Sequence, residues 1–154
     1  KWPNDIYIDA KKVTGILIES YLDPAPAPVG LVRQGFAIAG IGVNVNQTAF
    51  PPELKDRAAS LRQLTGRAFD RQRLAVAILR SLDAWYRPLE HDFASLLAAA
   101  EARSFLKGKW ITATLGGTEI SGEALRLDDT GGLVLRLPDG TETTISSGEV
   151  TVRW

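Results

Sequence analysis

Three short strings in this sequence combine the polar and glycine residues that a ligand site needs. The first, Lys1 to Asp5, reads KWPND, so a proline restricts the backbone just before an amide and a carboxylate. In one interpretation Asn4 and Asp5 only bond to nearby backbone groups, as such residues do in turns. In the other they point into a crevice at the end of a sheet. Residue type alone favours the turn.

Lys12 is the second candidate, because it lies beside Lys11 between two predicted strands. Most lysines in turns are simply solvated. The alternative is a cation aimed at a phosphate, since lysine carries a point charge on a flexible stem. Spacing alone does not choose between these interpretations.

The third string, Gly40 to Asn46, reads GIGVNVN. It is not a dinucleotide-binding fingerprint, because its G-x-G comes late in a predicted strand and no helix follows at once. One interpretation is a β-bulge followed by turn asparagines. The other is glycine backbone that a flat ligand approaches closely, with Asn44 placed to hydrogen-bond it. A lone G-x-G is weak evidence.

The sequence lacks the residues that several other kinds of catalytic or metal site need. Cysteine is absent, which excludes disulfides, thiolate metal sites and cysteine nucleophiles. His91 is the only histidine, and it falls at a predicted helix end, where a helix-terminal role is the simpler interpretation. No dense acidic cluster offers a full metal cage, and no serine has the glycine neighbours of a hydrolase nucleophile. The four tryptophans are most simply packing residues.

Composition narrows the range of partners. Lys+Arg and Asp+Glu each number 18, which argues against a nucleic-acid partner held mainly by charge, because phosphate neutralisation needs a clustered basic excess. The sequence has no apolar run of about 18 residues and no opening signal-peptide pattern, so we expect a cytoplasmic protein without a membrane partner. Because methionine is absent even at position 1, we also expect the sequence to start inside a longer polypeptide.

The elements that must position these candidates begin with three predicted strands. β-Branched and small residues place them at Asn4 to Asp9, Val13 to Ser20 and Phe36 to Val45. A short polar turn, residues 10–12, should join the first two. Asp23 to Gly30 carries prolines at alternate positions, so we expect an exposed connection there.

Helices are predicted next. Asp56 to Leu64 should form a short helix that ends before Gly66. Asp70 is a candidate N-cap for a longer helix, which Pro88 should end or kink. Phe93 to Phe105 predicts a further helix rich in alanine. The longer helix carries one apolar stripe, made of Leu74, Ile78, Leu82, Trp85 and Leu89.

From Gly108 onward the pattern changes to short strands separated by glycine and aspartate turns. Five strands at intervals of roughly ten residues indicate a small barrel. About 47 residues are few for an independent core, so this barrel should lean on the rest of the chain. We therefore expect two domains, 1–106 and 107–154. The predicted strands are Lys109 to Thr114, Glu119 to Leu127, Leu133 to Leu137, Thr141 to Ser146 and Glu149 to Trp154.

Taken together, the three strings resemble the signature of biotin protein ligases. Lys1 to Asp5 matches that family's KWPND, Lys11 to Glu19 is similar to its K-x-x-G-I-L-x-E strand, and Gly40 to Asn46 resembles its G-x-G-x-N-x-N strand. The resemblance covers essentially the whole chain. It implies an α+β fold, in which a mixed sheet fragment backed by helices, from the class II synthetase-like core, precedes a small SH3-like β-barrel.

The resemblance also implies an activity. These ligases join biotin to ATP, giving biotinyl-5′-adenylate and pyrophosphate, and then transfer biotin to a lysine of a biotin carboxyl carrier domain of a biotin-dependent carboxylase. The implied cofactors are therefore ATP, biotin and Mg²⁺. The family's glycine- and arginine-rich biotin loop lies upstream of KWPND and is not in this sequence, so we expect this segment alone to be inactive. The sequence leaves the oligomeric state and any upstream DNA-binding module open.

Roles for single residues follow from the same resemblance. Lys12 would be the catalytic residue, touching the biotin carboxylate and the α-phosphate and offsetting negative charge during acyl transfer. Gly15 and Gly40 would lie against biotin, and Asp5 would help to place Mg²⁺. The residues expected around ATP and the adenylate are Asn4, Asp5, Gly42, Asn44, Glu149 and Arg153.

Two other classes of function stay open at this point. One is a protein-binding module without catalysis, and the other is a relative of lipoate ligases that shares the fold but transfers another cofactor. KWPND and the predicted barrel favour biotin.

Overall fold

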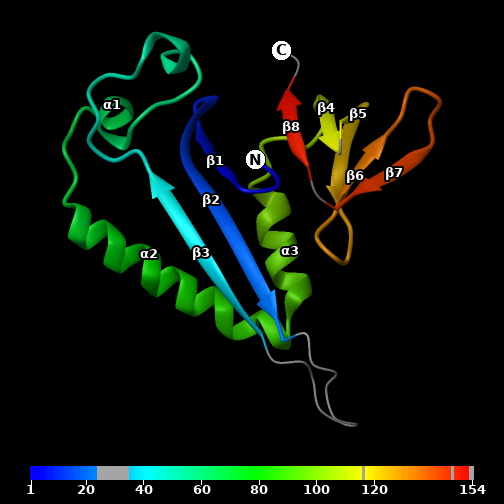
Figure 1. Ribbon diagram of the computed structural model, residues 1–154, viewed down its shortest axis with the longest axis horizontal. Coiled ribbons are helices and arrows are strands. Elements are labelled where there is room, and N and C mark those ends of the chain that lie inside the picture. Colours follow the sequence, from blue (N-terminus) through cyan, green and yellow to red (C-terminus); the bar gives the residue numbers. More distant parts are fainter. Residues whose placement is uncertain (24–34, 116, 147, 153–154) are drawn as a thin grey trace. The chain divides into compact units, whose positions relative to one another are not determined.

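The computed structural model of the chain describes residues 1–23, 35–115, 117–146 and 148–152 (Figure 1). Strands and helices gather in two compact units. One unit is Asn4–Ala68, and the other combines Lys1–Pro3 with Phe69–Trp154. Each unit contains one sheet, so the expected α+β class is confirmed. The predicted domain boundary at residue 107 stays a prediction. The division into compact units follows a different line, because it places residues 69–106, with their helices, in the same unit as the second sheet.

The first sheet is antiparallel throughout its described strands. It has the order β1-β2-β3, formed by β1 (Asp5–Ile8), β2 (Lys11–Leu22) and β3 (Gly35–Val43). The prediction of a mixed sheet is therefore wrong for these strands, since neighbours in sequence pair as hairpins do. A single isolated bridge, between Lys12 and Ala58, is parallel. The predicted connection at residues 24–30 lies outside the described residues.

The hairpin between β1 and β2 differs from the sequence prediction in two ways. The turn residues are Asp9 and Ala10, both with positive φ (48° and 62°), so Lys11 and Lys12 belong to β2 rather than to the turn. The register then shifts, because Ile6 pairs with Thr14 whereas Tyr7 pairs with Lys12. One residue of β2, Val13, is thus extra, and it forms a β-bulge.

A short capped helix follows β3 and the 3-10 turn η1 (Pro52–Leu54). Helix α1 (Leu61–Thr65) starts after the N-cap Ser60, which forms a capping box with Gln63, and it ends at Gly66 in the left-handed conformation. The predicted end is confirmed. The predicted start at Asp56 is wrong, because the backbone before Ser60 bonds to β2 instead, with the amide of Ala59 donating to the carbonyl of Lys12.

The two longer helices begin as their capping residues predict. Asp70 caps α2 (Arg71–Tyr86), and Asp92 caps α3 (Phe93–Ala102), which ends three residues before the predicted Phe105. The 3-10 turn η2 (Arg87–Glu90) contains Pro88 and ends α2, as expected. Among the described residues, no helix is both long enough and apolar enough to cross a membrane.

The second sheet contains all five predicted strands. In the order β7-β6-β5-β4-β8, every neighbouring pair is antiparallel. No pairing closes β7 onto β8 among the described residues, so barrel closure stays a prediction. The strands are β4 (Trp110–Leu115), β5 (Thr118–Leu127), β6 (Leu133–Arg136), β7 (Glu142–Ile145) and β8 (Glu149–Val152).

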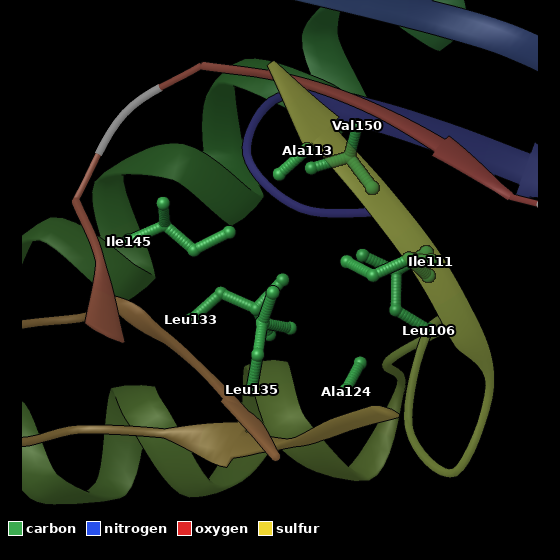
Figure 2. Close-up of a cluster of buried hydrophobic side chains, with 8 residues drawn as sticks. All are labelled: Leu106, Ile111, Ala113, Ala124, Leu133, Leu135, Ile145 and Val150. Atoms are coloured by element: carbon green, nitrogen blue, oxygen red, sulfur yellow. The ribbon is translucent and has the colours of Figure 1, made fainter. Parts of the chain in front are cut away.

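The described hydrophobic core belongs mainly to this second unit. Trp2 and Phe105, from outside the sheet, pack against it, so the sheet does lean on other parts of the chain. Trp110 is 43% exposed and Trp85 is 44% exposed, so neither is the buried packing residue that was expected of the tryptophans. The eight buried residues of the cluster are Leu106, Ile111, Ala113, Ala124, Leu133, Leu135, Ile145 and Val150 (Figure 2).

Replacement of Leu135 should test this core. Leu135 is fully buried in β6, so Leu135→Ala removes packed methyl groups and should cost about 2–5 kcal/mol of unfolding free energy. Urea titration followed by tryptophan fluorescence measures the loss. Leu115→Ala is the control, because Leu115 is 40% exposed. Equal losses for both variants would contradict the described core.

Candidate functional site

An ion pair joins two of the three candidate strings. Lys12 Nζ lies 2.6 Å from Asp5 Oδ1, and the exposed fractions of the two side chains are 42% and 11%. The carboxylate is thus largely covered, while the ammonium keeps part of its surface open. Lysine has three donors, so Lys12 can hold Asp5 and still contact a second anion.

The bulge at Val13 determines which face of the sheet carries Lys12. In a regular strand, residues 12 and 15 would point to opposite faces, because side chains alternate. The extra residue reverses that relation, and Lys12 pairs with Tyr7, which shares a face with Asp5. A Cβ at Gly15 would lie 3.3 Å from both Cε and Nζ of Lys12. The lysine side chain therefore lies over Gly15.

Asp5, Gly15 and Gly42 form one row across the three strands. Asp5 pairs with Gly15, and Gly15 pairs with Gly42, in a β2–β3 ladder without a register shift. The β-bulge interpretation of the third string is therefore wrong. A Cβ at Gly42 or Gly40 would meet nothing closer than 3.7 Å, so packing does not require glycine at either position. Gly42 leaves bare backbone next to Gly15, over which Lys12 lies, and Gly40 leaves bare backbone opposite Leu17.

Backbone hydrogen bonds fix the positions of Lys12 and Asn44. The amide of Lys12 donates to the carbonyl of Arg57 at 2.9 Å, and its carbonyl accepts from Ala59 at 3.0 Å. The amide of Asn44 donates to the carbonyl of Val13 at 2.9 Å. Both candidates are thus held by neighbouring segments, and their side chains are only partly buried.

The N-terminus of α1 offers no free donors to an anion. The amides of Leu61 and Arg62 donate to the carbonyls of Asn44 and Val45, each at 2.9 Å. The amide of Gln63 donates to the hydroxyl of Ser60 at 3.1 Å. These bonds occupy the groups that normally make a helix start attractive to phosphate. The start of α1 is therefore not the group that would hold a negative ligand, whereas the partly exposed ammonium of Lys12 could do so.

Asn4 bonds to backbone, but to that of β2 and not within its own turn. Its Nδ2 donates to the carbonyl of Ile16 at 2.8 Å, and its own carbonyl accepts from the amide of Ile16 at 2.8 Å. The side chain thus secures the start of β1 against β2. Any contact of Asn4 with a nucleotide stays a prediction.

The two candidates in the last strand stay untested. Glu149 begins β8, where it pairs with Thr114 through the backbone. Arg153 lies outside the described residues. The described part of the site is therefore confined to the first unit.

Sequence reasoning missed one feature of the site and one contact of the KWPND string. Val13 makes the bulge, but a bulge depends on strand pairing and leaves no clear mark in residue type. Trp2 was expected only to pack, yet its indole Nε1 also donates to the carbonyl of Gly131 at 3.0 Å. Its position inside KWPND was the available signal.

Comparison with known proteins gives this arrangement its context. Residues 1–48 match the model of the biotin/lipoate A/B protein ligase family, and residues 108–153 match that of the biotin protein ligase C-terminal domain. The apo structure of biotin protein ligase from Aquifex aeolicus superposes with a TM-score of 0.80 at 31% identity, covering 99% of this chain and 63% of that one. The chain belongs to the biotin protein ligase family.

Relatives of known sequence agree with that membership. The bifunctional ligase/repressor BirA of Bacillus subtilis is 38% identical over 151 residues, which make up 96% of this chain and 44% of that protein. The biotin–[acetyl-CoA-carboxylase] ligase of Mycobacterium tuberculosis is 35% identical over 151 residues, 97% of this chain and 51% of that protein. The chain thus spans about half the length of these ligases.

Replacement of Gly15 should disturb Lys12 without unfolding the sheet. The added Cβ of Gly15→Ala would meet mainly the flexible end of Lys12, at 3.3 Å, so the free energy of unfolding should change by less than about 1 kcal/mol. If Lys12 is the catalytic residue that the family resemblance implies, biotin-dependent pyrophosphate exchange by the full-length protein should nevertheless slow by about tenfold, because small displacements of a catalytic group are costly.

The matched control is Gly15→Ala in a Lys12→Ala background. There the new methyl group has no ammonium to displace, so it should cause little further loss of rate. A full additional loss in that background would show that Gly15 acts independently of Lys12.

Proposed function

We propose that the full-length protein is a biotin protein ligase, which forms biotinyl-5′-adenylate from biotin and ATP and transfers biotin to a carrier lysine. The observation that carries the proposal is the ammonium of Lys12, held by Asp5 above Gly15 and beside the bare backbone of Gly42. A structural neighbour is biotin protein ligase from Aquifex aeolicus in complex with biotin and ATP, with a TM-score of 0.80 and 31% identity. It supports the same pair of ligands.

Lys12 suits both steps of this reaction. In the first, a biotin carboxylate oxygen bonds to the α-phosphorus of ATP, and the bond to the pyrophosphate oxygen breaks. In the second, the acceptor amine bonds to the acyl carbon, AMP leaves with the electron pair, and the amine loses a proton. Negative charge gathers near the same atoms in both steps. A fixed ammonium stabilises that charge without reorganising.

The three glycines of β2 and β3 would contact different parts of the ligand. Gly15 and Gly40 would lie against biotin, while Gly42 would let the nucleotide approach the backbone. The backbone amide of Asn44 donates to the carbonyl of Val13, so its side chain would be left to contact the adenine or the phosphates. Asn4 would border the nucleotide from the start of β1.

Asp5 fits a supporting role for Mg²⁺ better than a dedicated metal site. Among the described residues, no group of three or more acidic or histidine side chains could hold a metal ion. Mg²⁺ often binds through one or two carboxylates and the substrate phosphates, with water completing the shell. The Asp5 carboxylate is one such ligand, and Lys12 already shares it.

The C-terminal strands complete the proposal. Glu149 and Arg153 stay predicted nucleotide-binding residues, and we expect the second sheet to close into an SH3-like barrel. The acceptor would be the biotin carboxyl carrier domain of a biotin-dependent carboxylase, as the name of the Mycobacterium relative suggests. A cytoplasmic location belongs to the same proposal. We assign this segment no nucleic-acid partner, although the name of the Bacillus relative includes a repressor function.

Lipoate transfer is the second candidate, because the model that matches residues 1–48 covers both biotin and lipoate ligases. The match of residues 108–153 to a biotin ligase C-terminal domain favours biotin. Pyrophosphate exchange with each acid in turn distinguishes them. Exchange with lipoate and not with biotin would replace the proposal, and exchange with neither acid would point to a non-catalytic module.

Lys12→Ala should slow both half-reactions of the full-length protein. Loss of a charge-assisted contact that forms in the transition state lowers kcat by about 100-fold or more. Stability should also fall, by about 1–3 kcal/mol, since the Asp5 carboxylate is only 11% exposed and loses its cation. Pyrophosphate exchange and single-turnover transfer to a carrier domain measure the two steps. Lys11→Ala is the control, because Lys11 only reaches the carbonyl of Lys55, at 3.3 Å.

Asn44→Asp should raise the KM for ATP strongly while leaving the melting temperature nearly unchanged. The backbone bond from residue 44 to Val13 survives the change, but the two amide donors are lost and a negative charge appears near the phosphates. Steady-state kinetics at saturating biotin give the KM. Asn46→Asp should have a smaller effect. If Asn44→Asp left the KM for ATP unchanged, the predicted contact with ATP would be wrong and Asn44 would have only a local structural role.

A further inference from the structure

Trp2 ties the first residues of the chain to the turn between β5 and β6. Its indole Nε1 donates to the carbonyl of Gly131 at 3.0 Å, across 129 positions of sequence. Its ring also packs against the buried cluster of the second sheet. Lys1–Pro3 accordingly belong to the second unit, whereas Asn4 is the first residue of the other. The KWPND string therefore contains the point where the chain passes between units.

The turn that receives Trp2 is held by a single carboxylate. Asp128 Oδ1 accepts from the amide of Thr130 at 2.9 Å, the hydroxyl of Thr130 at 2.8 Å and the amide of Gly132 at 2.8 Å. These bonds, that from the Thr130 hydroxyl above all, hold the pKa of Asp128 below its ordinary value. The carbonyl of Gly131 belongs to the same peptide group as the Gly132 amide, so the bond from that amide to Asp128 also fixes the carbonyl.

Steric constraints also restrict this turn. Gly131 has φ of 85°, which side chains other than glycine rarely adopt. A Cβ at Gly132 would lie 2.6 Å from Cγ2 of Thr144, so that position has no room for a side chain. The surroundings therefore define where the Gly131 carbonyl points.

A second anchor lies on the other side of Pro3. Asn4 is bonded to Ile16 twice, through its backbone carbonyl and its side-chain amide, each at 2.8 Å. The next residue, Asp5, holds Lys12. Only Pro3 separates Trp2 from Asn4, and the proline ring restricts φ. Trp2, which bonds to Gly131, is thus only two residues before Asn4 and three before Asp5 in the sequence.

We propose that the Asp128–Gly132 turn is a positioning device for the reaction, acting through Trp2 on the segment that carries Asn4 and Asp5. The proposal rests on the proposed ligase function and adds to it a role for the C-terminal domain. Trp2 and Asp128 are positioning residues, and neither contacts a reacting atom in this scheme. The hydrogen bond limits the conformations of the KWPND string before substrate arrives, so less entropy is lost in reaching the transition state.

The first test compares two tryptophan variants of the full-length protein. Trp2→Phe keeps an aromatic ring but loses the indole donor, and Trp110→Phe is the matched control on the exposed part of β4. Trp2→Phe should lower kcat for biotin-dependent pyrophosphate exchange about fivefold to tenfold, the scale of one hydrogen bond. KM for biotin and for ATP should stay within about twofold. If the role of Trp2 were only structural, Trp2→Phe would lower the melting temperature. The kcat measured well below the melting temperature would then be unchanged.

The second test uses the carboxylate that holds the turn. Asp128→Ala should reproduce the loss of kcat, while Asp128→Asn should restore most of it, because the amide oxygen still accepts hydrogen bonds. The double variant Trp2→Phe/Asp128→Ala should be no slower than the slower single variant, since both act through one contact. The Trp2 indole proton, followed by NMR, should exchange faster in Asp128→Ala.

The outcomes separate this proposal from the function on which it rests. If Trp2→Phe matches Trp110→Phe in kcat, or if the Trp2 and Asp128 effects simply add, the positioning role is overturned and the ligase function stands. If the unchanged protein shows no biotin-dependent pyrophosphate exchange, the ligase function fails and the positioning role fails with it. Faster indole exchange with an unchanged kcat would also overturn the proposal, because the contact would then be structural only.

Discussion

The β-bulge at Val13 is the constraint on which the site depends. It brings Lys12 onto the face of β2 that holds Gly15, where Asp5 can pair with it. Val13 is 2% exposed, so packing opposes any slip of this register. Its carbonyl also accepts the amide of Asn44, which ties the end of β3 to the bulge. A single extra residue therefore aligns candidates from two strands, and a regular hairpin of the same sequence would separate them.

The parts of the fold that were predictable are those with local causes. Asp70 and Gly66 mark helix ends because capping is decided within a few residues, and the later strands follow from short alternating segments between turns. The bulge, the start of α1 and the row of glycines depend on pairing between segments distant in sequence. Gly15 and Gly42, for example, meet only after β2 and β3 pair. The sequence therefore predicted which residue types could form the site. It did not predict that they lie on the same face of the sheet.

Net charge gave little information about the site, because the relevant electrostatics are local. Arg126 pairs with Glu142 and Arg136 with Glu123 across the second sheet, yet all four side chains are at least 38% exposed. Arg126 lowers the pKa of Glu142, but solvent screens such surface pairs and they contribute little stability. Asp5 differs, since only 11% of its side chain is exposed. A zero total charge is compatible with one well-placed ammonium.

The unequal exposure of Lys12 and Asp5 bears on how the pair works. A largely covered carboxylate is costly without a cation, so the pairing with Asp5 keeps the ammonium in place. The open side of Lys12 can meanwhile meet an incoming anion, and the ammonium need not move between a resting and a working position. An ammonium held in this way is already oriented when charge develops, whereas a free surface lysine would have to be ordered at that moment. In the proposed function the aspartate thus acts on the ligand through the lysine, and the two residues and the glycine beneath them would act as one unit.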